Sequence, residues 1–357
     1  MRLFTCGNCG HPVYFQNTYC QSCGNSLGFD PNRLLMVSLA LQNDGSLLEQ
    51  TSGQTYHYCA NHEYDVCNWI IPDTDPASFC IACSLNRVIP DLNNMVYRTR
   101  WEKTEAAKHR LVYALLQWEL PVQSKIFDEA GLVFDFMADA GSNEPRVLTG
   151  HTNGVITINI AEADDVEREM ARNSMDEVYR TLLGHFRHEV GHYYWDLLIQ
   201  NSSFLQEFRT LFGNETYDYQ EALNRHYAEG PPASWNENYI SSYATMHPWE
   251  DWAETWAHYL HIVDTIEAAY SFGLSIHPPD FSNDQHMCAN IRLDPYQLKD
   301  FEAIFQYWLP LTFAMNTINR SMGGQDLYPF VISPKVKEKL RFVHKVIHSQ
   351  QIGSGEQ

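Results

Sequence analysis

A short motif near the middle of the chain combines two histidines and a glutamate at a spacing suited to metal chemistry. Residues 188–192 read His-Glu-Val-Gly-His and match the HExxH pattern. On a helix with about 100° per residue, His188 and His192 differ by only ~40°, so both imidazoles can reach one ion. Glu189 lies at ~100°, where its carboxylate can act as a general base beside that ion. The motif indicates a zinc centre with its own base.

The sequence around the motif supports this interpretation. Chance alone would yield HExxH in roughly a few per cent of chains this rich in histidine, so the context must decide. The apolar residues fall between ~120° and ~220° on the same helical wheel, opposite the motif: Leu182, Leu183, Phe186, Val190, Tyr193 and Leu197. Gly191 weakens a helix, and we explain it by the close approach of another backbone. His185 lies on the motif side, where we expect it to contact the substrate or support a ligand.

A catalytic zinc also needs a third protein ligand and an open position for water. The residues after His192 lack the glycine and third histidine of the metzincin pattern, which excludes that subclass. Further along, residues 247–258 read His-Pro-Trp-Glu-Asp-Trp-Ala-Glu-Thr-Trp-Ala-His. Glu250 and Glu254 differ by ~40° on a helical wheel and lie opposite an aromatic stripe. Solvated acids are the ordinary explanation of such a pair, but the HExxH helix favours a third ligand here, with Glu250, Glu254 and Asp251 as candidates.

The first four cysteines form a second kind of metal pattern. Cys6-Gly-Asn-Cys9 is followed, after ten residues, by Cys20-Gln-Ser-Cys23. Each CxxC turn directs two thiolates at one point, and two such turns complete a closed tetrahedral zinc site. This region resembles a zinc ribbon. It carries almost no charge, so we interpret it as a folding and docking module for a protein partner.

The next four cysteines are spaced less regularly, and only the last two form a CxxC. They are Cys59, Cys67, Cys80 and Cys83. We expect a second four-cysteine zinc site, because a short polar region needs such a staple and metal binding of ~10–16 kcal/mol can replace a missing core. His57 and His62 lie close enough in sequence to replace one thiolate.

Charge and composition restrict the classes of partner. The 357 residues include 44 acidic and 24 basic side chains, for a net charge of −20. Such a surface repels phosphates, which argues against nucleic acid or an anionic membrane as the main partner. No stretch approaches the ~20 apolar residues of a membrane-spanning helix, and no signal-peptide pattern precedes the cysteines. We therefore expect a cytoplasmic protein, in which reduced and clustered cysteines bind metal.

The elements that must position these groups are mostly helical. The apolar periods predict helices over residues 100–119, 163–200, 248–271, 294–319 and 334–349. Strand patterns cover residues 131–136, 146–149 and 155–160, and Asn153-Gly154 is a typical hairpin turn between the last two. The strand at 155–160 is either an edge that binds an extended peptide or an internal strand. These elements predict an α+β fold.

Two of these segments together resemble a known group of peptidases. HExxH followed downstream by Glu-x-x-Ala-Glu is similar to the gluzincin arrangement, most of all to the group containing anthrax lethal factor. The resemblance implies that Glu250 is the third zinc ligand, that Glu254 orients a ligand histidine, and that Tyr243, seven residues before Glu250, stabilises the oxyanion. His247 would assist there or merely cap the helix. A separation of 57 residues between His192 and Glu250 exceeds the family's pattern and would shape the cleft.

The whole chain resembles bacterial zinc-binding metallopeptidases that carry an N-terminal zinc ribbon. From this resemblance, together with the cysteine spacing and the helical periods, we expect a zinc-ribbon region with two four-cysteine zinc sites at residues 1–95, a mostly helical zincin-like domain with a small β-sheet at 96–350, and a flexible tail at 351–357. The resemblance implies one catalytic zinc besides one or two structural zincs, and a peptide or protein substrate. The rival interpretation is a zinc-ribbon adaptor whose peptidase site is inactive.

Overall fold

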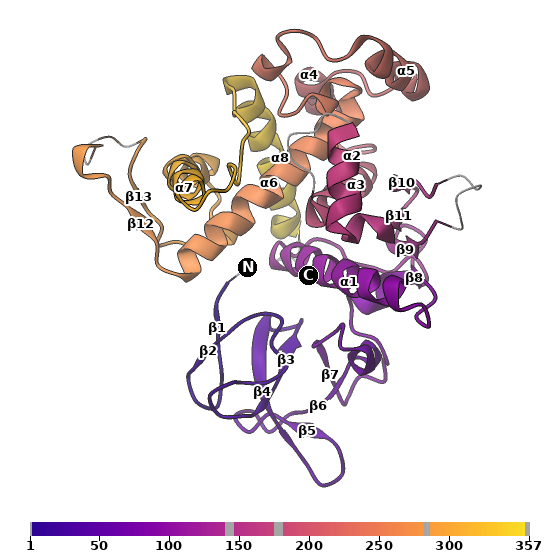
Figure 1. Cartoon of the computed structure of the whole chain (residues 1–357), viewed down its shortest axis with the longest axis vertical. Coiled ribbons are helices and arrows are strands. Elements are labelled where there is room, and N and C mark those ends of the chain that lie inside the picture. Colours follow the sequence, from indigo (N-terminus) through magenta and orange to yellow (C-terminus); the bar gives the residue numbers. More distant parts are fainter. Residues whose placement is uncertain (1, 140–145, 175–180, 282–283, 285, 354–357) are drawn as a thin grey trace. The chain divides into compact units, whose positions relative to one another are not determined.

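The computed structural model of the chain describes residues 2–139, 146–174, 181–281, 284 and 286–353 (Figure 1). Contacts divide the chain into two compact units. Unit 1 comprises Met1–Gly150 and Gly154–Asp164, and unit 2 comprises His151–Asn153 and Asp165–Gln357. Both helices and small sheets occur, as the α+β prediction requires. We expected a new domain to begin at residue 96. The helix there, α1 (Met95–Gln117), is grouped by its contacts with unit 1.

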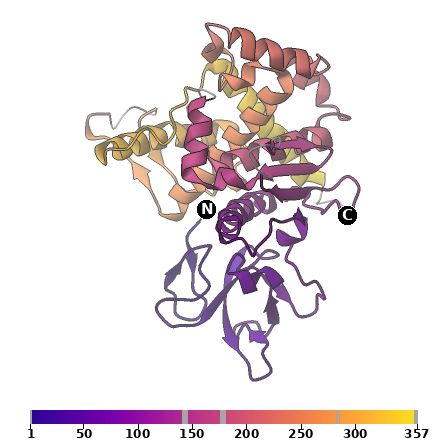
Figure 2. The ribbon, with the colours of Figure 1, turned by 45° about the vertical axis from the view of Figure 1, so that its right-hand side comes forward.

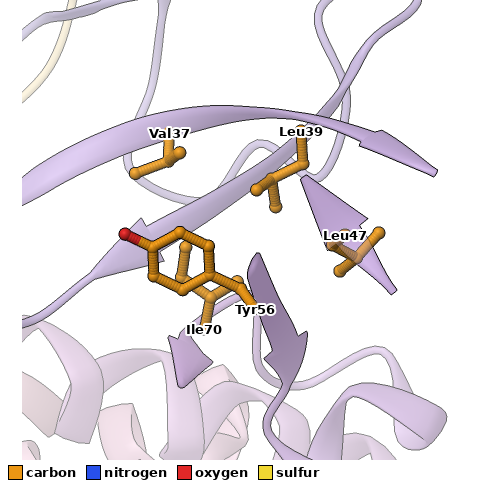
Figure 3. Close-up of a cluster of buried hydrophobic side chains, with 5 residues drawn as sticks. All are labelled: Val37, Leu39, Leu47, Tyr56 and Ile70. Carbon is orange, nitrogen blue, oxygen red and sulfur yellow. The ribbon is translucent and has the colours of Figure 1, made fainter. Parts of the chain in front are cut away.

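Unit 1 begins with short antiparallel strands. They are β1 (Phe4–Thr5), β2 (Pro12–Val13), β3 (Ser26–Asp30), β4 (Leu35–Leu41), β5 (Leu47–Leu48), β6 (Thr55–Tyr58) and β7 (Ile70–Pro72). β1 pairs with β2, and β3 to β7 form a five-stranded antiparallel sheet in chain order. Figure 3 shows the apolar cluster that this sheet buries, formed by Val37, Leu39, Leu47, Tyr56 and Ile70. The region therefore has a small core of its own besides its cysteine clusters.

Unit 1 continues with a long helix and a second sheet. The elements are β8 (Asn86–Val88), α1 (Met95–Gln117), β9 (Val133–Met137), β10 (Gly150–Thr152) and β11 (Val155–Asn159). Of these, residues 151 and 152 of β10 are grouped with unit 2. The sheet has the order β10-β11-β9-β8, with β9 parallel to both of its neighbours. β11 therefore has a strand on each side, so the predicted strand at 155–160 is internal and not an edge for peptide addition. α1 begins earlier than predicted because the Asn94 side chain caps it, accepting hydrogen bonds from the amides of Val96 and Tyr97.

The hairpin at Asn153-Gly154 forms, but its first strand is shifted. Both turn residues have positive φ, 46° and 73°, as a tight hairpin turn requires. The strand that leads into the turn is β10, whereas the prediction placed it at residues 146–149. Side chains satisfy the backbone there: Asp139 accepts from the Val147 amide, and the Asn159 side chain donates to the Val147 carbonyl. These hydrogen bonds occupy the amide and the carbonyl of Val147, so neither group is available to pair with a neighbouring strand.

Unit 2 is mostly helical. Its helices are α2 (Asp165–Ser174), α3 (Leu182–Leu198), α4 (Leu205–Phe212), α5 (Tyr219–Glu229), α6 (Pro248–Ser271), α7 (Phe301–Ser321) and α8 (Pro334–Gly353). α6 packs against α3, α4, α7 and α8. The short strands β12 (Ser275–Ile276) and β13 (Ala289–Asn290) pair between α6 and α7, visible as orange strands in Figures 1 and 2. Among the helices that the structure describes, none is both long and apolar enough to span a membrane.

The predicted single helix at 163–200 is wrong, because α2 and α3 are separate helices. Thr181 has an extended backbone, with φ −130° and ψ 151°, and its hydroxyl accepts a hydrogen bond from the Gly184 amide at 3.0 Å. A threonine in this conformation is a helix N-cap, so α3 starts at Leu182. By contrast, α6 has the predicted bounds, with Pro248 in its first turn. α8 reaches Gly353, and residues 354–357 of the predicted tail lie outside the described residues.

Candidate metal centre

Helices α3 and α6 carry the predicted metal-binding side chains and pack closely together. A Cβ atom at Gly191 would lie 3.2 Å from the Ala253 Cα atom and from the Trp256 Cβ atom. This confirms the predicted close approach of another backbone at Gly191. The Trp252 indole also donates to the Gly191 carbonyl at 2.8 Å. The missing side chain therefore lets the HExxH helix approach α6 until side chains from both helices can share one ion.

Three side chains from these helices converge on one point. His188 Nε2 lies 3.2 Å from His192 Nε2 and 2.9 Å from Glu250 Oε2. His192 Nε2 lies 3.4 Å from Glu250 Oε1. Although burial opposes its ionisation, His192 and His188 hold the pKa of Glu250 well below its usual range. The three groups offer two imidazole nitrogens and one carboxylate, a set that zinc enzymes use.

The geometry of this set fits a tetrahedral zinc ion. Zinc bonds to nitrogen and oxygen of about 2.0–2.2 Å place neighbouring tetrahedral ligand atoms roughly 3.3–3.5 Å apart. The observed separations of 2.9–3.4 Å are close to that value. Glu254 Oε1 lies 2.7 Å from His188 Nδ1, so that nitrogen carries a proton and Nε2 can present a lone pair. His188, His192 and Glu250 can therefore hold zinc and leave a fourth position open.

A chain of hydrogen bonds supports His188. Glu254 accepts from His188 Nδ1 through one carboxylate oxygen and from the Ser241 hydroxyl through the other, at 2.7 and 2.6 Å. Burial by itself raises the pKa of Glu254. The hydrogen bond to His188 and the charge of His188 outweigh this effect and lower the pKa to about 2. The carboxylate is therefore ionised and fixes the ring orientation, as metal-bound histidines generally require. Ser241 carries no sequence signal of this role, since only the fold brings it next to Glu254.

Two tyrosines and a glutamate lie close to the three ligand side chains. Burial raises the pKa of the Glu189 carboxyl, which suits a base that takes a proton near neutral pH. The Tyr219 hydroxyl donates to Glu250 Oε1 at 2.9 Å. Burial, the Glu250 charge and Tyr219 raise the pKa of Tyr243 far above its usual value. Tyr243 thus keeps its hydroxyl proton and can donate it in a hydrogen bond. Tyr219, within the long segment between the two motifs, carries no sequence signal.

The remaining predicted residues lie around this centre in different roles. Asp251 is fully buried and forms an ion pair with Lys339 at 2.5 Å, so its carboxylate serves the contact between α6 and α8. His247 is the N-cap of α6: Nδ1 accepts from the Trp249 amide, and Nε2 donates to the Tyr217 carbonyl. His185 lines a cavity next to His188.

Two further side chains enclose His192. The Trp249 ring lies over it, with centroids 3.8 Å apart. His151 packs nearby, with ring centroids 6.3 Å apart and planes 15° from parallel. His151 Nε2 also lies 4.0 Å from an Asp196 oxygen. Neither neighbour could be found from spacing, because His151 lies in β10 and Trp249 in the first turn of α6, both far from the HExxH motif in sequence.

The first cysteine cluster has the separations of a tetrahedral thiolate site. Cys6 and Cys23 have sulfurs 3.8 Å apart, and the sulfurs of Cys9 and Cys20 are 3.6 Å apart. Zinc–sulfur bonds of about 2.3 Å place neighbouring sulfurs about 3.8 Å apart, whereas a disulfide would bring them to roughly 2 Å. All four thiols are free. The cluster therefore fits zinc.

The second cysteine cluster is deeper. Cys59, Cys67, Cys80 and Cys83 are all buried and their sulfurs lie within 4.8 Å of one another. The structure does not bring His57 or His62 into this cluster. His57 contacts Asp73 and the Ala77 carbonyl, while His62 contacts the Cys67 carbonyl and stacks on Tyr58.

Helix α1 closes the second cluster with polar side chains that the sequence analysis missed. His109 Nε2 lies 3.7 Å from the Cys83 sulfur, and Glu105 Oε2 lies 3.9 Å from it. Lys108 is fully buried and pairs with Glu105 at 2.9 Å. His109 Nδ1 donates to the Glu105 carbonyl at 2.7 Å. The cluster is thus tied to a helix that follows it in sequence.

Comparison with known families agrees with these two kinds of site. Residues 97–346 match the family described as "putative zinc-binding metallo-peptidase", and residues 3–94 match a zinc-ribbon domain. The first match covers well over half of the chain. The chain belongs to this zinc-binding metallo-peptidase family and carries an N-terminal zinc ribbon.

Relatives extend over nearly the full length. Uncharacterized proteins of Mycobacterium bovis and Mycobacterium tuberculosis are 44% identical over 349 residues, covering 97% of this chain and 95% of each relative. No solved structure matches the chain significantly. The relatives share both regions but indicate no substrate.

Proposed function

We propose that this protein is a zinc-dependent peptidase of the gluzincin kind, similar in its site to the lethal-factor group. The observation that carries the proposal is the convergence of His188 Nε2, His192 Nε2 and a Glu250 oxygen within 2.9–3.4 Å. Three ligands and an open position are typical of catalytic zinc sites, whereas structural sites have four protein ligands. The family match supports zinc binding and peptide hydrolysis at the level of the class.

A zinc ion held by this set would supply a Lewis acid and acidify a water molecule. Glu189 takes the proton of the attacking water and delivers it to the leaving amine, because burial raises its pKa toward neutrality. Tyr243 donates its hydroxyl hydrogen bond to the oxygen that becomes negatively charged during attack. Glu254 and Ser241 keep the His188 ring oriented. Tyr219 restrains the Glu250 carboxylate through its hydroxyl.

Metal analysis of the full chain tests the ligand assignment without a known substrate. We expect three zinc ions in the wild type and two in His192→Ala, because the two cysteine clusters keep theirs. Glu189→Gln should retain all three and lose hydrolysis of a mixed peptide library by about 10²–10⁴-fold. The matched control is Glu129→Gln, the same change at an exposed position of unit 1.

Two results would overturn the proposal. An unchanged zinc count in His192→Ala would show that the HExxH helix holds no zinc, and the zinc-ribbon adaptor would become the better interpretation. Hydrolysis retained in Glu189→Gln would remove Glu189 from its role as base.

A further inference from the structure

A cavity of about 330 Å³ lies beside the candidate metal centre, within unit 2. It is bounded by α3, by α6, and by the segments 235–243 and 329–331. His188, Tyr243 and Glu254 belong both to its lining and to the metal centre or its immediate support. We call this space the side-chain pocket. A group that enters it must therefore be attached to an atom very near the reaction site.

Apolar side chains form a large part of the wall of the side-chain pocket, with Asn236, Ser242 and His261 among its polar residues. Ile240 and Ala257 line it and are themselves buried, with 2% and 6% of their surface exposed. Phe330 forms another part of the wall, and its ring packs 4.3 Å from the His258 ring. Pockets that hold small ligands usually have volumes of about 300–1,000 Å³, so this one suits a single large side chain.

The pocket offers few partners for a charged side chain. Glu254 is the only carboxylate among its lining residues in the described part of the chain, and both of its oxygens already accept hydrogen bonds. Lysine and arginine are absent from the described lining. Burial lowers the pKa of His258 to about 4, and its Nδ1 contacts the Tyr328 hydroxyl at 2.8 Å. A buried ion without a partner is strongly disfavoured.

We propose that the side-chain pocket selects peptides with a large uncharged side chain, aromatic or branched aliphatic, next to the scissile bond. This inference rests on the proposed peptidase function and adds the substrate class. The pocket shares Tyr243 with the reaction site, so the selected residue is directly bonded to the group under attack. An apolar pocket of this kind discriminates between large and small side chains by about 10- to 200-fold in kcat/KM.

A peptide library gives the first test. The zinc-loaded full chain is incubated with acetylated and amidated dodecapeptides that carry every residue type at each position, and products are identified by mass spectrometry. We expect Phe, Tyr, Leu and Met to be enriched at one position flanking the cut, with Asp, Glu, Lys and Arg depleted. Cleavage without such enrichment, or with a charged preference, overturns the pocket assignment and leaves the proposed function standing.

Binding gives a second readout that needs no turnover. Hydroxamates of phenylalanine, alanine and aspartate share one metal-binding head and differ in the side chain, and calorimetry on the zinc-loaded full chain compares their affinities. The phenylalanine compound should bind at least about 10-fold more tightly than the alanine compound, and the aspartate compound least tightly. Equal affinities contradict the pocket. Failure of all three to bind, together with no hydrolysis, contradicts the peptidase function itself.

Matched variants on one helix locate the effect. Ala257→Leu fills the pocket from α6 and should remove the advantage in kcat/KM of phenylalanine over alanine next to the cut. Ala268→Leu makes the same change later in α6, outside the lining residues, and should keep the wild-type preference. If Ala257→Leu folds poorly, Phe330→Ala provides the opposite change, because it enlarges the pocket. It should raise the preference for tryptophan over phenylalanine by about 10-fold, and an unchanged ratio counts against the proposal.

Discussion

The cysteine clusters of unit 1 and the histidine–glutamate centre of unit 2 collect metal-binding atoms in opposite ways. Each cysteine cluster brings four sulfurs together, a set that can complete the coordination of one zinc. Among the residues that the structure describes, the centre on α3 and α6 brings together three ligand atoms, and it lies beside a cavity. The number of protein ligands therefore distinguishes the two cysteine clusters, which suit a structural zinc, from the α3–α6 centre, which suits a catalytic zinc.

The two cysteine clusters also differ from each other. Cys9 of the first cluster is exposed and Cys23 is partly exposed, whereas the four sulfurs of the second cluster are on buried residues. Glu105 and His109 of α1 approach the second cluster only. The second cluster is therefore part of the core of unit 1, while the first lies at its margin.

The largest expected effect is loss of the second cluster. Because binding of a structural zinc contributes about 10–16 kcal/mol to small domains, Cys80→Ser should remove one zinc and the protected structure of β6 and β7. Hydrogen exchange followed by mass spectrometry, with zinc analysis, measures both. Cys9→Ser is the matched comparison and should leave β6 and β7 protected. Equal damage from both variants would contradict the distinction between a core and a marginal cluster.

The buried ion pair between α6 and α8 should have the next largest effect. Asp251 and Lys339 have 0% and 3% of their side chains exposed, so Lys339→Met leaves a buried carboxyl without its partner. Breaking such a pair costs about 3–5 kcal/mol. Urea unfolding measures the loss, and Asp251→Asn combined with Lys339→Met should restore part of it. If Asp251→Asn alone loses zinc at the α3–α6 centre while its free energy of unfolding is unchanged, Asp251 is a ligand and not a structural partner.

Removing the Tyr243 hydroxyl tests whether the α3–α6 centre is catalytic, in contrast to the four-sulfur cysteine clusters. Tyr243→Phe should lower kcat by about 10²–10³-fold, equivalent to about 2.7–4 kcal/mol, because one donor to the oxyanion is lost. Zinc content and KM should change little. Steady-state kinetics on a peptide from the library screen provides the measurement, and Tyr227→Phe, on the exposed side of α5, serves as the control. A change confined to KM would assign Tyr243 to substrate binding alone.

The smallest effect concerns the support of His188. Glu254→Gln should weaken zinc binding at the α3–α6 centre by about 10- to 100-fold without abolishing it, because an amide orients the ring less well than a carboxylate. Ser241→Ala should weaken it less, since Ser241 acts through Glu254. Competition with a chelator measures both affinities. Loss of zinc in Glu254→Gln as complete as in Glu250→Ala would make Glu254 a ligand.

Much of the candidate site was visible in local patterns. The CxxC turns and the HExxH motif bring their ligands together over three or four residues, so backbone geometry alone brings those side chains near one point. The bounds of α6 also followed from the sequence, since Pro248 and the aromatic period define its start and its buried face. Gly191 indicated a close helix contact before its partner was known.

Other features depended on contacts between distant residues. The break between α2 and α3 comes from a capping hydrogen bond of Thr181, which is weak as a sequence signal. Tyr219, Ser241 and His151 reach the centre from a helix start, a loop and the short strand β10, whose positions no periodicity predicts. The contact of His109 with Cys83 joins residues from two elements, each ordinary by itself.

The sequence by itself therefore determined which residues can bind metal and which neighbours on the same turn or helix share a site, because those relations follow from backbone geometry. Only the tertiary structure decided that Glu250, and neither Asp251 nor Glu254, faces both histidines, because helix packing selects which side of α6 meets α3. The side-chain pocket was equally absent from the sequence, since its walls come from four segments that only folding assembles.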